Sequence, residues 1–182
     1  ESICGFEALA RLKTSELGSV TPGEFIPIAE KSKLIIPIGD KIILRALDFQ
    51  SRLEKEGFEG LSTAINISVI QLLVPGFADT LIGMVHEKRI DPKNITIEIT
   101  ESVFEYDFDY INSVLVELRK SGLTLAIDDF GTGYSSLSRE MHLDVDCIKI
   151  DKFFIDHILE IEKPITCDII EIAHKQEHYV VG

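Results

Sequence analysis

Strand-like apolar runs alternate with helix-like patterns along this chain, and that alternation limits the fold more than any other feature. The runs expected to form strands are residues 2–9, 61–67, 94–100, 123–127, 145–150 and 178–181. The segments expected to form helices are 22–30, 35–57, a short piece after Ser68, 77–89, 111–118, 135–141, 153–161 and 164–175. Strands and helices that alternate in this way predict a parallel sheet covered by helices.

Two of the expected helices begin with a capping box. Thr21 precedes a proline, and Glu24 follows Thr21 at the spacing that lets each side chain bond the backbone amide of the other. Ser68 and Gln71 have the same spacing. We therefore expect one helix to begin near residue 22 and another directly after Ser68.

The charge of the chain restricts its partners. With 31 acidic and 18 basic residues, its formal net charge is −13, so a surface that binds duplex DNA is not expected. An acidic chain can still bind an anionic substrate if metal ions bridge the two. No apolar run reaches the about 18 residues that a spanning helix needs, so we predict no membrane segment and a cytoplasmic location.

Three cysteines and five histidines show no spacing typical of a zinc site or a disulfide framework. We predict that Cys4, Cys147 and Cys167 are buried, reduced thiols in a reducing compartment. The histidines are interpreted as structural.

Polar side chains near the ends of the expected strands share one face. Successive strand residues face opposite sides, so the isoleucines of run 94–100 face one way and Glu98 the other. The same parity applies to residues of the other runs, namely Glu7, Asn66, Asp128 and Lys149. Buried in an open sheet, such a polar face is costly. A closed (β/α)8 barrel, with its chemistry at the carboxyl ends of the strands, explains the pattern better than the alternative, a doubly wound open sheet.

Five of these strand-end residues are oxygen donors that together carry four negative charges. They are Glu7, Asn66, Glu98, Asp128 and Asp129. Hard divalent cations such as Mg²⁺ or Mn²⁺ prefer oxygen ligands, and four carboxylates suit two ions better than one. Two ions side by side are typical of phosphoester hydrolysis. The alternative is a set of unrelated polar residues, which their common face disfavours.

Two basic residues could act on a phosphoryl group. Lys149 could neutralise its charge or hold the attacking water, although pairing with Asp151 for structure is an alternative. Arg11 could bind a phosphate through two parallel hydrogen bonds, or it could be an ordinary surface residue. The residue pattern leaves both alternatives open.

The motifs around these residues resemble those of the EAL domain family, in order and over nearly the whole chain. They are Glu7-Ala8-Leu9-Ala10-Arg11, Asn66-Ile67-Ser68, Glu98-Ile99-Thr100-Glu101, Asp128-Asp129-Phe130-Gly131-Thr132-Gly133-Tyr134-Ser135-Ser136-Leu137 and Lys149-Ile150-Asp151. The segment Pro22 to Glu30 is similar to the first helix of that family. The resemblance implies a cyclic di-GMP phosphodiesterase on a modified (β/α)8 TIM-barrel-like fold, which releases linear pGpG and uses Mg²⁺ or Mn²⁺.

The resemblance also implies roles for the metal ligands. Glu7, Asn66, Glu98 and Asp128 would hold one ion, and Asp128 would bridge to a second ion that Asp129 also serves. Lys149 would orient the attacking water.

Four further residues take supporting or substrate-binding roles by the same resemblance. Asp151 would support the site, and Glu101 would anchor the loop 129–135, which in the family couples the second ion to dimerisation. Arg11 and the backbone near Leu9 would contact the substrate.

The chain departs from the family pattern at both ends. It begins after the first strand of the family and stops before a Glu-Gly-Val-Glu motif whose first Glu is the expected general base. We therefore expect residues 1–182 to be a single EAL domain truncated at both ends, with about six strands, weakened metal binding and turnover that is absent or very low. A homodimer and attached sensor or cyclase domains, in a parent protein that could associate with a membrane, are expected from the resemblance.

Two other functions stay open. The first is a catalytically inactive receptor that binds cyclic di-GMP and signals by conformation. The second is another two-metal phosphohydrolase on a barrel, which a comparison of a cyclic dinucleotide with a phosphomonoester would separate.

Overall fold

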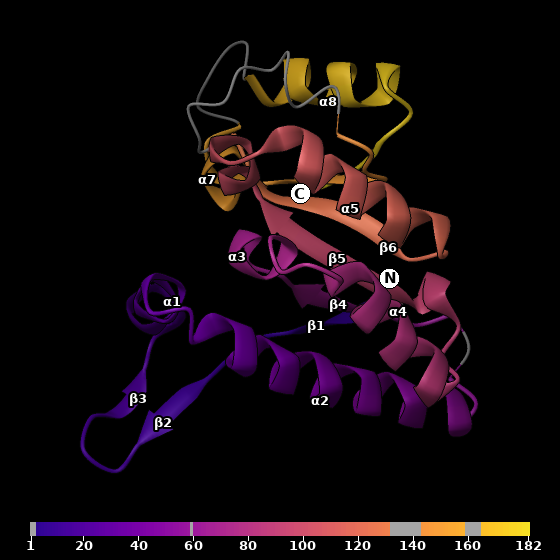
Figure 1. The fold of residues 1–182 in the computed structure, drawn as a ribbon. Coiled ribbons are helices and arrows are strands. Elements are labelled where there is room, and N and C mark those ends of the chain that lie inside the picture. Colours follow the sequence, from indigo (N-terminus) through magenta and orange to yellow (C-terminus); the bar gives the residue numbers. More distant parts are fainter. Residues whose placement is uncertain (1–2, 59, 132–142, 159–164) are drawn as a thin grey trace. The chain divides into compact units, whose positions relative to one another are not determined.

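A computed structural model describes residues 3–58, 60–131, 143–158 and 165–182 of the chain (Figure 1). The chain divides into two compact units, Glu1–Thr96 and Ile97–Gly182. Each unit is described by itself.

The first unit is built on two parallel strands and the helices that follow them. β1 (Gly5–Ala8) pairs with β4 (Ser62–Asn66), and Glu7 lies opposite Ala64. A small antiparallel hairpin of β2 (Leu12–Thr14) and β3 (Gly18–Val20) follows β1. The helices are α1 (Pro22–Lys31), α2 (Ile35–Lys55), α3 (Val69–Leu72) and α4 (Phe77–Lys88), and the 3-10 turn η1 (Pro92–Asn94) leads into β5 (Ile95–Thr100).

The long helix α2 joins the core of the first unit through both apolar and polar contacts (Figure 1). Ile43 and Leu47 are buried on its inner face. Gln50, on the same face, is fully buried and bonds the strand side of the core: its Nε2 donates to the Leu61 carbonyl oxygen at 3.0 Å and its Oε1 accepts from Thr63 Oγ1 at 2.7 Å. A buried amide bonded at both ends stabilises the packing, because none of its polar groups loses a partner on folding.

The second unit continues the alternation of strand and helix. Its elements are the greater part of β5, η2 (Glu101–Glu105), α5 (Phe108–Lys120), β6 (Thr124–Phe130), β7 (Cys147–Ile150), α7 (Lys152–Asp156), α8 (Ile165–Lys175) and β8 (Tyr179–Val181). The strands of this unit follow the order β5-β6-β7-β8. β7 pairs in parallel with both neighbours. Its Ile148 lies opposite Ile127 of β6 and Val180 of β8.

All six expected strands are confirmed, and both capping boxes form. The hairpin of β2 and β3 was not expected, because the polar run after Arg11 lacks a strand pattern. The helix expected over 153–161 ends at Asp156 within the described residues. The helical turn expected over 135–141 lies outside them. No described helix has the length and apolarity to cross a membrane.

The expectation that all three cysteines are buried was wrong for two of them. Cys4 and Cys167 are exposed, whereas Cys147 on β7 is buried. Cys4 precedes the first strand and Cys167 lies on the outer face of α8, where a small residue is tolerated without burial.

Burial of Cys147 raises the pKa of its thiol to about 12. Because the thiolate is the reactive form, we expect Cys147 to resist a disulfide reagent at pH 8. Titration with Ellman's reagent should modify Cys4 and Cys167 rapidly and Cys147 only after unfolding in guanidinium. Rapid modification of all three thiols in the folded chain would contradict this packing.

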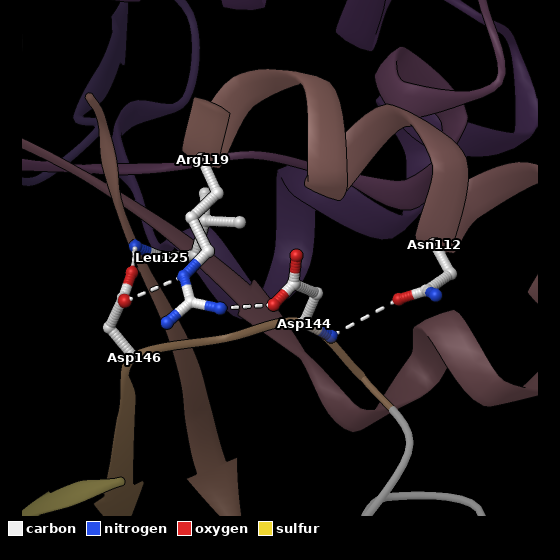
Figure 2. A network of polar contacts seen from close by, with 5 residues as sticks. All are labelled: Asn112, Arg119, Leu125, Asp144 and Asp146. Atoms are coloured by element: carbon white, nitrogen blue, oxygen red, sulfur yellow. Dashed lines mark hydrogen bonds and ion pairs between the residues drawn. The ribbon is translucent and has the colours of Figure 1, made fainter. Parts of the chain in front are cut away.

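A polar network fixes the segment before β7 to the rest of the second unit (Figure 2). Arg119, at the end of α5, donates from Nε to Asp146 Oδ1 at 2.8 Å and forms an ion pair with Asp144. Asp146 Oδ2 accepts from the Leu125 amide at 2.9 Å, and Asn112 Oδ1 accepts from the Asp144 amide at 3.1 Å. The two aspartates thus tie three chain segments together.

Loss of the Asp146 carboxylate should destabilise this unit. Asp146→Ala leaves the part-buried Leu125 amide without its acceptor, which costs about 1–3 kcal/mol. Asp156→Ala is the matched control, because it removes an exposed ion pair with Lys152 that contributes roughly 0.5 kcal/mol or less. Urea unfolding measures both variants, and equal losses of stability would rule out the role of the network.

Candidate active site

Two groups of residues carry the expected site, one in each unit. In the first unit, Glu7 lies on β1 and Asn66 is the last residue of β4. Asn66 Nδ2 donates to Glu7 Oε1 at 2.8 Å, and both side chains are exposed. Because the amide nitrogen bonds Glu7, Asn66 offers its carbonyl oxygen as the remaining polar atom, which is the atom a hard cation would bind.

The two residues expected to bind substrate lie just after β1. Leu9 is 55% exposed. Arg11 is exposed and donates from Nη1 to the Ala10 carbonyl oxygen at 2.8 Å. This local bond leaves the other guanidinium donors directed at solvent or at an anion.

In the second unit, Lys149 of β7 lies between two carboxylates, one on the neighbouring strand β6 and one on β5, the next strand in the sheet. Its Nζ is 2.7 Å from Glu98 Oε1 and 3.1 Å from Asp128 Oδ2. Glu98 is 4% exposed, and the other two side chains are about one fifth exposed, at 22% for Lys149 and 20% for Asp128. The ammonium group thus neutralises two acidic groups that would otherwise repel one another.

Two opposing effects, burial and the neighbouring carboxylates, determine the pKa of Lys149. Burial lowers the pKa of the ammonium group, but hydrogen bonds and Coulomb attraction from Glu98 and Asp128 outweigh burial and raise it above its ordinary value. Lys149 is therefore charged at neutral pH and does not act as a base in this arrangement.

A β-bulge presents the adjacent acids at the end of β6. Ile127 pairs with Ile148 and Phe130 pairs with Ile150, so Asp128 and Asp129 together face the single residue between those partners on β7. Asp129 has a φ of 55°, in the left-handed region that aspartate tolerates better than most residues. Its amide donates to Asp128 Oδ1 at 3.0 Å. Bulges of this kind redirect side chains and are frequent beside active sites.

Glu101 and Asp151 hold the backbone on either side of these acids. Glu101 is buried, and its Oε1 accepts from the Gly131 amide at 2.6 Å, at the start of the expected loop. The other expected loop residues, from Thr132 onward, lie outside the described part of the chain. Asp151 caps α7, with Oδ1 accepting from the Phe153 amide at 2.8 Å.

Lys149 therefore pairs with Glu98 and Asp128 in the described part of the chain, and the alternative pairing with Asp151 is not seen there. Strand parity indicated that Glu98 and Lys149 share a face. The bulge was missed, because no residue pattern marks the extra residue in β6.

The donor set of the second unit fits a divalent cation. Carboxylate oxygens of Glu98 and Asp128 lie within 4.8 Å of one another and already surround one positive group. Carboxylate oxygen is the ligand that Mg²⁺ and Mn²⁺ prefer. Glu98 and Asp128 could hold a metal ion in this unit, and Glu7 and Asn66 offer ligands of the same kind in the other.

Comparison with known proteins identifies the family of the chain. The family model for the EAL domain matches residues 1–182. The signaling protein YkoW of Bacillus subtilis is 38% identical over 188 residues, which cover 100% of this chain and 23% of YkoW. MucR of Pseudomonas aeruginosa, a bifunctional diguanylate cyclase/cyclic di-GMP phosphodiesterase, is 36% identical over 85% of this chain and 22% of its own length. The chain thus spans less than a quarter of these relatives.

The fold is shared with solved structures of the same family. The PaMucR phosphodiesterase in complex with c-di-GMP matches with a TM-score of 0.86 and 30% identity over 96% of this chain and 71% of that chain. The expected TIM-barrel-like fold with about six strands is confirmed by this likeness. The chain belongs to the EAL domain family.

Proposed function

We propose that this chain is a cyclic di-GMP phosphodiesterase domain that hydrolyses one phosphodiester bond and releases linear pGpG. The observation that supports the proposal most is the approach of Glu98 and Asp128 to one cation, Lys149, since two such carboxylates supply the oxygen ligands of the divalent ions that assist phosphoester hydrolysis. MucR, whose name gives it this activity, supports the choice of substrate.

The proposal assigns the metal ligands as follows. Glu7, Asn66, Glu98 and Asp128 would hold one ion of Mg²⁺ or Mn²⁺, and Asp128 and Asp129 would together serve a second. When bound, the ions activate water and stabilise the charge of the attacking and leaving oxygens. The bulge at Asp128 supports the shared role, because it sets two adjacent acidic residues opposite one residue of the next strand.

The other residues position the reactants. Lys149 holds the attacking water by donating a hydrogen bond, and its charge stabilises the phosphoryl oxygens. Arg11 and the backbone near Leu9 bind the phosphate and ribose of the substrate. The water oxygen bonds to phosphorus and gives up one proton to solvent, the bond from phosphorus to the 3′ oxygen breaks, and that oxygen takes up one proton from solvent to give a 3′ hydroxyl.

Two residues keep this arrangement in place. Glu101 fixes Gly131, the first residue after β6 and two positions after Asp129. Asp151 fixes the start of α7 directly after the strand that carries Lys149. A homodimer, and further sensor or cyclase domains in the same polypeptide, belong to this proposal.

Metal-bridged binding has a direct test. The chain and cyclic di-GMP are both anionic, so without divalent ions we expect weak binding. Isothermal titration should show affinity at least about tenfold higher with Mn²⁺ than with EDTA, which corresponds to roughly 1.4 kcal/mol. Equal affinity in the two conditions would contradict metal-bridged binding.

The other two functions predict different assay results. An inactive receptor would bind cyclic di-GMP and leave it intact in Mn²⁺, whereas the phosphodiesterase converts it. A general two-metal phosphohydrolase would cleave p-nitrophenyl phosphate at least as fast as the cyclic dinucleotide. We expect cleavage of the dinucleotide alone.

A further inference from the structure

The segment that follows Asn66, the last residue of β4, is held from two sides through one hydroxyl-bearing residue, Ser68. Ser68 Oγ donates to Glu30 Oε1 of α1 at 2.7 Å and accepts from the Ile70 amide at 3.2 Å. The Ser68 amide donates to Gln71 Oε1 of α3 at 3.2 Å. Side chains from α1 and α3 therefore hydrogen-bond Ser68, which lies two positions after Asn66.

The orientation of the Gln71 side chain leaves one of its buried polar atoms without a hydrogen-bond partner. The residue is 2% exposed, and its Nε2 is buried with no hydrogen-bond partner among the described residues. A Cβ at Gly39 of α2 would lie 2.1 Å from that nitrogen, so even a methyl group there would collide with the amide. A buried amide nitrogen without a partner costs about 1–3 kcal/mol. The fold thus keeps the Gln71 oxygen on the Ser68 amide at the expense of its nitrogen.

Asn66 itself has little packing to orient it. Its side chain is exposed, and its side-chain hydrogen bond in the described structure is the one to Glu7, at 2.8 Å. The direction of the Asn66 carbonyl oxygen therefore depends on the backbone at the end of β4, which is followed two residues later by the fixed Ser68.

We propose that Glu30 and Gln71 are positioning residues, which act through Ser68 to fix Asn66 for metal binding. The inference rests on the proposed function, because Asn66 is a ligand only there. Neither Glu30 nor Gln71 touches an ion. Residues that orient a ligand from behind typically change metal affinity by about 10–100-fold when they are replaced.

Helix α1 supplies a matched pair of variants for the test. Glu30→Ala removes the carboxylate that bonds Ser68. Glu24→Ala removes a carboxylate on the same helix that bonds another hydroxyl, Thr21 Oγ1, at 2.6 Å in the other capping box. Both variants lose one charge and one hydrogen bond to a hydroxyl group. Glu24→Ala also loses the bond from the Thr21 amide at 3.0 Å, but only Glu30→Ala loses the bond to Ser68.

Mn²⁺ titration followed by electron paramagnetic resonance provides the first readout. We expect Glu30→Ala to weaken binding about tenfold or more and Glu24→Ala to change it less than about twofold. Glu30→Gln should restore binding, because its amide oxygen can accept the same bond from Ser68. Binding by Glu30→Ala equal to that of the wild-type chain would overturn the positioning role.

The side-chain amide of Asn66 gives a second readout that needs no metal. In ¹⁵N-labelled, metal-free chain, Glu30→Ala should shift the Asn66 side-chain amide resonances and Glu24→Ala should leave them in place. If the wild-type chain binds no Mn²⁺, the proposed metal site fails, and the amide shift alone decides whether Glu30 holds Asn66. An unmoved amide in Glu30→Ala overturns the inference.

Discussion

Replacement of Lys149 by methionine is expected to tighten Mn²⁺ binding and to slow turnover strongly. The ammonium group lies 2.7 Å from Glu98 and 3.1 Å from Asp128, so it competes with a metal ion for the same oxygens. Removal of one positive charge at this range should strengthen cation binding roughly tenfold or more. The same change removes the group that holds the attacking water, which should slow hydrolysis by about 100-fold or more.

The opposite signs of these two effects separate a functional lysine from a structural one. Lys152→Met is the control, since it removes the same charge from an exposed ion pair on α7. We expect the control to bind Mn²⁺ as the wild-type chain does. Weaker Mn²⁺ binding by Lys149→Met would contradict competition between the lysine and the metal.

Asp128→Asn is expected to have the largest effect on metal binding. The amide is nearly isosteric but removes the charge proposed to serve both ions, so Mn²⁺ affinity should fall about 100-fold or more. Stability should change little, because the variant also relieves repulsion between Asp128 and the adjacent Asp129. Mn²⁺ titration and urea unfolding measure the two effects.

Two further variants make this result specific. Asp129→Asn should remove the second ion and spare the first, because Asp129 serves one ion in the proposal. Asp156→Asn, in an exposed pair with Lys152, should leave Mn²⁺ binding unchanged. Unchanged affinity in Asp128→Asn would refute the assignment of Asp128 as a shared ligand.

The strand positions could be predicted because the apolar pattern follows burial closely. Ile95, Ile97 and Ile99 are buried on β5 as their alternation indicated, and the capping boxes placed the starts of α1 and α3. The inner face of α2 was less predictable, because it includes Gln50 and Ser51, which are buried through hydrogen bonds instead of apolar character.

The site could be predicted in part. The alternation of strand residues predicted that Glu98 and Lys149 share a face, and in the structure their side chains form an ion pair. Strand alternation did not reveal the bulge, which sets both Asp128 and Asp129 opposite one residue of β7. A bulge depends on pairing between strands that are distant in sequence, so local patterns do not reveal it.

The contact between Glu30 and Ser68 shows the same limit. Ser68 was marked as a helix cap, but its second bond comes from a helix 38 residues earlier. Propensity and spacing describe neighbours along the chain, and a bond across that distance appears only once the unit has folded.

The most direct test of the proposed function is product analysis after a single turnover. Cyclic di-GMP is incubated with an excess of the chain in Mn²⁺, and the nucleotides are separated by chromatography, so that even very slow hydrolysis is detected. We predict linear pGpG as the product in Mn²⁺ and none in EDTA or with Asp128→Asn. Cyclic di-GMP that binds the chain in Mn²⁺ and is recovered intact would contradict the proposed hydrolysis and favour the receptor.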